Sequence, residues 1–193
     1  MTPASRARLV VPLLAPLLAL VACRPEPAAT TSAPPAPSPV SALAGFDGPV
    51  EDDPVAKEAT ALSEGPLTQC AERDAVGMKM EGDLIASKLA PGQVLEQEFR
   101  LQPGRCYTLI AVGGEGVKEL DASFETIGPV RSKSTVLAAD ALSGTTAVVG
   151  AGEACFAWKP ELNATPAKFV LRVRGGDGVV VSQLYARNAT PTP

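Results

Sequence analysis

Cysteine is the residue type with the clearest chemistry in this chain of 193 residues. There are four cysteines (Cys23, Cys70, Cys106 and Cys155) and no histidine. A thiol can be acylated, oxidised to a disulfide or used as a metal ligand. The lack of histidine removes the commonest general base and the commonest zinc ligand. Ser-His-Asp and Cys-His catalytic arrangements are therefore excluded, and carboxylates are the remaining candidates for acid–base chemistry.

Cys23 stands at the end of a short apolar segment near the N-terminus. Two arginines, Arg6 and Arg8, precede an apolar run of about 14 residues that ends at Ala22. A transmembrane helix needs roughly 20 apolar residues, whereas the apolar core of a signal peptide has about 7 to 15. The pattern therefore predicts a signal peptide over residues 1–22.

The four residues Leu20-Val21-Ala22-Cys23 resemble the lipobox of bacterial type II signal sequences. This resemblance implies cleavage before Cys23, a thioether-linked diacylglycerol on its sulfur and usually an N-acyl chain, which together form a stable membrane anchor. Residue 24 is Arg24 rather than the aspartate that often marks inner-membrane retention. We therefore expect an anchored envelope protein, in the outer membrane and facing the periplasm or the cell surface. The alternative is an ordinary secretory signal.

Residues 23–49 form the predicted tether, rich in proline, alanine, serine and threonine. Large apolar side chains are scarce, so this segment cannot offset its chain entropy and is expected to be disordered. Its prolines favour an extended polyproline II spacer.

The charge of the chain excludes some partners. Without the signal peptide, 15 Lys and Arg residues face 21 Asp and Glu residues, a net charge of −6. This balance argues against nucleic acid as a partner. We expect no cofactor.

An exported protein occupies an oxidising compartment, so cysteine pairing is expected. With Cys23 assigned to lipid, the other three cysteines permit three single pairings. We favour Cys106–Cys155, because both residues begin strand-like runs in the same predicted domain. Cys70 is then left over, either as a small buried side chain or in an intermolecular disulfide.

Hydrophobic periodicity divides the remaining chain. One or two short helices are predicted within residues 50–78, where acidic residues and an early proline mark a helix start. A mainly β domain follows over residues 79–187, because short runs alternate with period two between glycine-rich turns. We predict an antiparallel β-sandwich or jelly roll, with 175–178 as a hairpin turn and 188–193 as a disordered tail.

Four sequence stretches carry a second resemblance: "LQPGRCYTLIAVGGEGVKELDASF", "VLAADALSG", "CFAW" and "FVLRVRGGDGVVVSQLY". Their order resembles a domain of uncharacterised myxobacterial lipoproteins. It is also similar, more distantly, to the pre-peptidase C-terminal type of β-sandwich. No peptidase domain precedes it. The resemblance implies a fold and a location, and no reaction.

Carboxylates are the remaining candidates for a site. Asp121, Asp140 and Asp177 lie near predicted turns or strand edges, where calcium could use their oxygens. They form no D-x-D-x-D cluster, and turn formation is the favoured interpretation. Paired carboxylates could hydrolyse glycosides, but sequence spacing places no two of them together. We predict no catalytic and no metal-binding residue.

Three functions follow from these patterns. The favoured one is a non-catalytic, lipid-anchored module that binds an envelope protein or polymer. The second is a structural assembly subunit that uses its sheet edges or Cys70. The third is a small histidine-free envelope hydrolase, which a clustered pair of buried carboxylates would favour.

Overall fold

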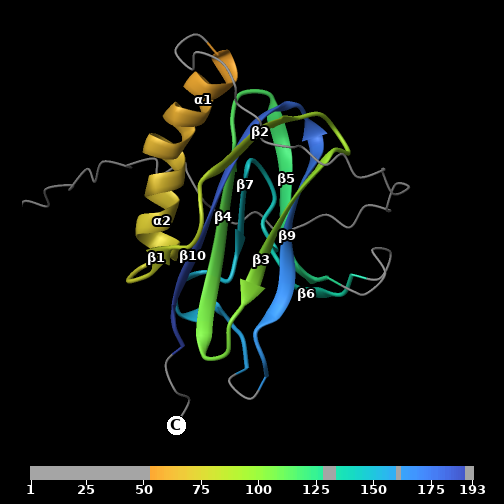
Figure 1. Cartoon of the computed structure of the whole chain (residues 1–193). Helices are drawn as coiled ribbons and strands as arrows, with labels where there is room; N and C mark the ends of the chain where they lie inside the picture. Colours follow the sequence, from red (N-terminus) through yellow and green to blue (C-terminus); the bar gives the residue numbers. More distant parts are fainter. Residues whose placement is uncertain (1–52, 128–133, 160–161, 190–193) are drawn as a thin grey trace, which may run out of the picture.

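A computed structural model describes residues 53–127, 134–159 and 162–189. The predicted signal peptide, Cys23 and the tether lie outside these residues. The described chain is a β-sandwich of two antiparallel sheets, with a helix packed on the outer face of one of them (Figure 1). The predicted fold class is therefore confirmed.

The first sheet, sheet A, has the order β1–β10–β4–β7, with β2 also paired to β10 and β8 also paired to β4. Its strands are β1 (Lys79–Met80), β2 (Ile85–Leu89), β4 (Arg105–Gly113), β7 (Thr146–Val149), β8 (Phe156–Ala157) and β10 (Gly178–Asn188). Sheet B has the order β3–β9–β5–β6. Its strands are β3 (Val94–Leu101), β5 (Val117–Thr126), β6 (Val136–Ala139) and β9 (Thr165–Gly176).

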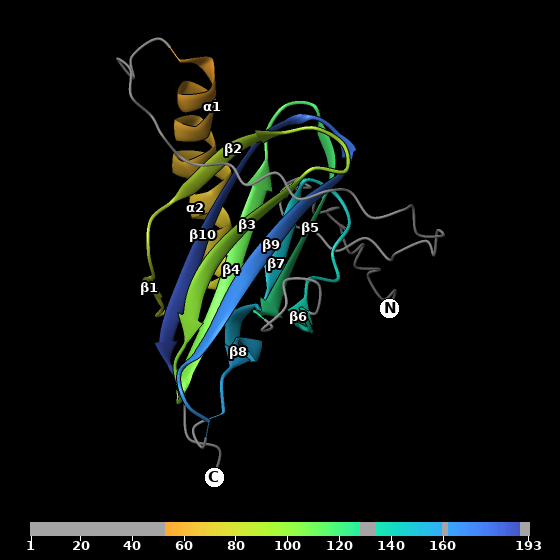
Figure 2. The same cartoon turned by 45° about the vertical axis from the view of Figure 1, so that its right-hand side comes forward.

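Two layers of apolar side chains hold the molecule together, one on each face of sheet A. Between the sheets, Leu109, Phe124 and Leu171 are among the fully buried residues of the larger cluster. On the opposite face of sheet A, Ile110 and Val181 belong to a second cluster, which packs under the helix. Because both faces of β4 and β10 are covered, these strands are apolar almost throughout, whereas strands of sheet B alternate. Figure 2 shows the layers from the side.

The helix runs without a break from Pro54 to Asp74, as α1 (Pro54–Leu62), η2 (Ser63–Leu67) and α2 (Thr68–Asp74). Asp53 caps its start, and its Oδ1 accepts a hydrogen bond from the N–H of Val55 at 2.9 Å. The sequence predicted one or two short helices, because a second proline, Pro66, marks a further helix start. In the structure the helix instead continues through a single π-helical turn that contains Pro66, which has no N–H to donate.

The predicted disulfide between Cys106 and Cys155 is confirmed, and it joins residues 49 apart in the sequence. It fastens the two-residue strand β8 and the preceding 3-10 turn (Gly152–Ala154) to β4. Cys70 is buried in α2 and is also disulfide-bonded, and no described cysteine is free. The expectation that Cys70 is left over is therefore wrong. The prediction assigned Cys23 to lipid; a thioether on Cys23 and a disulfide between Cys23 and Cys70 exclude each other, because both would use the same sulfur.

The glycine-rich segment 175–178 was predicted to be a hairpin turn, and this is wrong. It connects β9 of sheet B to β10 of sheet A, so the strands on either side of it do not pair. Gly176 has φ +75°, and a Cβ on it would lie 1.9 Å from the carbonyl oxygen of Gly116. Glycine is needed here because two crossover turns touch at this end of the sandwich.

Two strands of sheet A differ from the prediction. Strand β2 was not predicted, although it forms part of the sheet edge. Strand β10 continues through Asn188, and residues 190–193 of the predicted tail lie outside the described chain.

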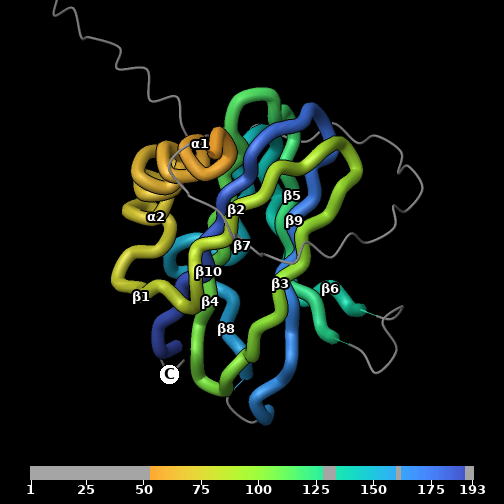
Figure 3. Tube along the Cα trace, turned by 45° about the horizontal axis from the view of Figure 1, so that its top comes forward, coloured from red at the N-terminus to blue at the C-terminus, as the bar shows by residue number. Residues whose placement is uncertain are grey.

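No helix in the described ranges is long and apolar enough to cross a membrane. Figure 3 shows the helix and β6 on opposite sides of the sandwich.

Candidate binding slot

The sandwich is open along one side, where β2 of sheet A and β3 of sheet B face each other. Both are edge strands among the described residues: β2 pairs with β10 alone, and β3 pairs with β9 alone. A slot of about 870 Å³ lies between them. This volume is in the range of ordinary ligand sites, roughly 300–1,000 Å³. We call this space the β2–β3 slot.

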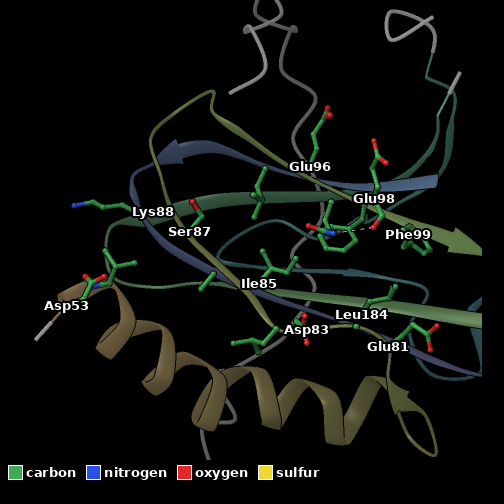
Figure 4. A pocket seen from close by; sticks show the side chains of 17 residues that line it. Asp53, Glu81, Asp83, Ile85, Ser87, Lys88, Glu96, Glu98, Phe99 and Leu184 are labelled. Carbon is green, nitrogen blue, oxygen red and sulfur yellow. Dashed lines mark hydrogen bonds between the residues drawn. The ribbon is translucent and has the colours of Figure 1, made fainter. Parts of the chain in front are cut away.

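Apolar side chains form the inside of the slot. In Figure 4 the side chains of Ile85, Ser87 and Leu184 rise from sheet A toward β3. Phe99 and Phe169 line the slot from sheet B, with ring centroids 6.3 Å apart. The interior is thus continuous with the core of the sandwich, and an apolar group that enters it is removed from water.

Charged side chains surround the opening. The slot is lined by the acidic residues Asp53, Glu81, Asp83, Glu96 and Glu98 and by one basic residue, Lys88. Two of the carboxylates are paired: Glu81 binds Arg105, and Glu96 binds Lys168 at 2.7 Å. Even after these pairs are counted, the rim carries more negative than positive charge and favours a cationic ligand.

The backbone of β3 offers unpaired groups to the slot side. Just before β3, the N–H of Gly92 donates a hydrogen bond to the carbonyl of Val173 in β9. The N–H of Val173 donates in turn to the carbonyl of Gln93. In an antiparallel pair, the backbone groups of successive residues point alternately toward and away from the neighbouring strand. The backbone groups of Leu95, Gln97 and Phe99 therefore bond to β9. Those of Glu96 and Glu98 point to the free edge. The side-chain amide of Gln97 donates to the carbonyl of Glu98 at 3.3 Å. This hydrogen bond agrees with a Glu98 carbonyl that points to the free edge and accepts no hydrogen bond from β9 (Figure 4).

Side-chain contacts fix the wall of the slot opposite β3. The buried Gln183 of β10 donates its amide to the carbonyl of Gly82 at 3.2 Å. Arg105 holds Glu81 through two hydrogen bonds of 3.0 and 2.9 Å. The N–H of Glu81 bonds to the carbonyl of Leu184. These contacts hold residues 81–84 against β10 and keep the slot open.

An acidic cluster lies elsewhere, on the outer face of sheet B. The carboxylate of Asp121 forms a two-point contact with the guanidinium of Arg174, which also reaches Glu119 at 3.3 Å. The neighbouring Asp140 accepts a hydrogen bond from the N–H of Ala122 at 2.7 Å through its Oδ1. Burial, with a smaller contribution from the charge of Asp121, raises the pKa of Asp140 to about 6.

The structure brings Asp121 and Asp140 together but does not add Asp177 to them. Asp177 lies in the crossover turn after β9, where its N–H donates to the carbonyl of Gly116. Within the described residues, no group of three or more Cys, Asp or Glu side chains is arranged to hold a metal ion. The turn-forming role is thus the one that the contacts of Asp140 and Asp177 support.

Asp121 and Asp140 also bear on the hydrolase hypothesis, because they are the kind of carboxylate pair that it requires. A general acid must come within hydrogen-bond reach of its substrate. Oδ2 of Asp140 is buried without a hydrogen-bond partner, and Oδ1 is used by the backbone of β5. Asp121 is neutralised by Arg174. The pair closes the turn after β6 and offers no accessible acid.

Sequence reasoning missed the slot and its residues. Ser87, Phe99 and Gln183 carried no local signal, because each looks like an ordinary strand residue. The one available signal was Gln97, a polar residue at an inward position of an alternating strand. No protein-family model and no curated protein matched the chain when it was compared with them.

Proposed function

We propose that this chain is a lipid-anchored envelope protein that binds a partner in the β2–β3 slot, without catalysing a reaction. The observation that carries the binding role is the slot itself: an opening between two free sheet edges, apolar inside and acidic at its rim. An apolar interior with a few polar groups around it is the usual composition of a binding site.

The lipobox motif Leu20-Val21-Ala22-Cys23 supports the anchor. A thioether on Cys23 would place the chain at a membrane surface, in the outer membrane and facing the periplasm or the cell surface. The proline-rich residues 24–49 would hold the domain away from the lipid, at up to roughly 3.1 Å per residue. Tethering raises the effective concentration of the slot near other envelope components. The partner is an envelope protein or polymer; a structural assembly subunit is the alternative.

A membrane-partition experiment tests the anchor. We expect the wild-type protein to enter the detergent phase with the membrane fraction and Cys23→Ser to leave it, because several acyl chains are needed for stable anchoring. Partition of Cys23→Ser with the membrane would contradict the lipid anchor. Intact mass spectrometry distinguishes the ordinary secretory alternative, because a lipidated N-terminus adds the mass of its acyl chains.

A crosslinking pull-down from intact cells tests the binding role. Tagged wild-type protein is compared with Cys23→Ser and with Phe99→Asp, which places a charge inside the slot. We expect a partner with the wild type that is lost in Phe99→Asp. Because that variant also perturbs aromatic packing, its melting temperature is measured in parallel, and Gln97→Trp fills the slot mouth as a second block. Capture that survives both blocks would contradict a binding role for the slot.

A further inference from the structure

The β2–β3 slot has the geometry to accept one extended peptide as an additional strand of sheet B. We infer that the slot binds a segment of a partner protein in which basic and apolar residues alternate, paired through its backbone to the free edge of β3. This inference rests on the proposed binding function and specifies its ligand. Backbone pairing to a sheet edge is a general mode of peptide recognition.

The free edge of β3 has room for a further strand along its exposed centre. Strand β3 has eight residues, and three consecutive ones at its centre, Glu96, Gln97 and Glu98, are exposed. The backbone groups of Glu96 and Glu98 point away from β9. Within the described part of the chain, no hydrogen bond reaches the N–H of either residue. An added strand supplies the acceptors that these N–H groups lack.

An added strand would present two faces with different surroundings. Side chains on one face would enter the slot above Ile85 and Leu184, beside Phe99. Side chains on the other face would stand next to Glu96 and Glu98, whose side chains point away from the slot interior (Figure 4). Because successive side chains of a strand point in opposite directions, the matching ligand alternates apolar and basic residues.

The charges also argue against a second copy of this chain as the occupant. If two β3 strands paired antiparallel about Gln97, Glu96 of each copy would lie directly opposite Glu98 of the other. Pairing about Glu98 would place the two Glu98 carboxylates opposite each other, with Glu96 opposite Arg100 on either side. Like charges at such positions are destabilising. Charged residues on an edge strand commonly prevent association of this kind. The same charges favour a basic strand.

The test uses the purified full-length lipidated protein in detergent and a fluorescein-labelled peptide, acetyl-KVKVKVKV-amide, with binding measured by fluorescence anisotropy. The decisive pair of variants is Glu98→Pro and Glu98→Gln. Both remove the same charge, but only the proline removes the N–H at the free edge, and proline is tolerated at an edge strand where its nitrogen faces outward. We expect Glu98→Gln to weaken binding about threefold and Glu98→Pro at least tenfold.

A second measurement does not depend on the folding of a variant. The same peptide is N-methylated at alternate residues, so that one of its edges cannot donate hydrogen bonds, and is tested on the wild-type protein. Two methylated peptides are made, one methylated at the odd-numbered residues and one at the even-numbered residues, because the register decides which edge of the peptide pairs with β3. We expect one of the two to bind at least tenfold more weakly than the parent peptide. Equal binding of all three peptides would overturn backbone pairing, as would equal affinities of Glu98→Pro and Glu98→Gln.

The inference and the proposed function fail in different ways. If the peptide does not bind, but partner capture in cells is lost in Phe99→Asp and in Gln97→Trp, the slot binds another class of ligand and only the inference is wrong. If Glu98→Pro also abolishes a dimer seen by analytical ultracentrifugation, a second copy occupies the edge and the inference is again wrong. If neither peptide binding nor partner capture depends on the slot, both are wrong.

Discussion

Removing the Cys106–Cys155 disulfide is expected to destabilise the fold substantially. The bond closes a loop with a sequence separation of 49 and fastens β8 to β4. On the chain-entropy model, closing a loop of this length stabilises the folded state by about 4 kcal/mol. The double variant Cys106→Ala/Cys155→Ala should therefore have a free energy of unfolding about 4 kcal/mol lower than wild type. Its melting temperature should fall by roughly 15 °C.

Urea denaturation followed by the fluorescence of Trp158 measures this difference. Trp158 is the only tryptophan of the chain and packs beside Phe156 of β8, with ring centroids 6.3 Å apart. Substitution is preferable to a reducing agent, because Cys70 is also disulfide-bonded and would be reduced as well. If the free energy of unfolding falls by less than about 1 kcal/mol, and its slope against urea concentration is unchanged, the loop-closure reasoning is refuted.

Three further predictions concern the pH dependence, the crossover turn and the slot wall. A carboxyl group whose pKa is raised on folding contributes its full stabilisation of the folded state at pH values below its pKa in the unfolded chain. This contribution is lost as the pH rises through its pKa in the folded state. The free energy of unfolding of the wild type should therefore fall by about 1–2 kcal/mol relative to that of Asp140→Asn between pH 4 and 7, because solvent partly screens the half-buried carboxylate. Parallel stability–pH curves for the two proteins would contradict this. Gly176→Ala should unfold at a markedly lower temperature than Gly92→Ala, because both glycines have a positive φ but only the first has no room for a Cβ; equal losses would contradict the steric account. Gln183→Met should lower stability by about 1 kcal/mol and increase amide hydrogen exchange in 81–84; unchanged exchange would show that the amide does not hold this wall.

The sequence allowed much of the sandwich to be predicted, because most of its strands carry a local pattern. Leu95, Phe99 and Leu101 alternate with charged residues, so β3 could be recognised before its partner was known. Strand β2 was missed because Ile85–Leu89 packs one face under the helix and the other into the slot, and small residues replace the usual alternation. A strand that is half-buried on both faces lacks the alternation of apolar and polar residues, so its sequence resembles that of a loop.

The other differences come from contacts between distant segments. A glycine-rich turn such as 175–178 has the same composition whether it joins paired strands or crosses between sheets. The choice is set by which strands β9 and β10 meet. The proximity of Asp121 and Asp140 depends on the pairing of β5 with β6. The slot depends on how far the two sheets separate at their edge, which no single segment encodes.

Site-specific photo-crosslinking in intact cells is the measurement that tests the binding role of the slot most directly. Benzoylphenylalanine is placed at Gln97, in the slot mouth, and in a matched protein at Val136 of β6, which is 58% exposed at the other edge of sheet B. We predict a crosslinked partner from position 97 and none from position 136. No adduct from position 97, or the same adduct from both positions, would contradict the account.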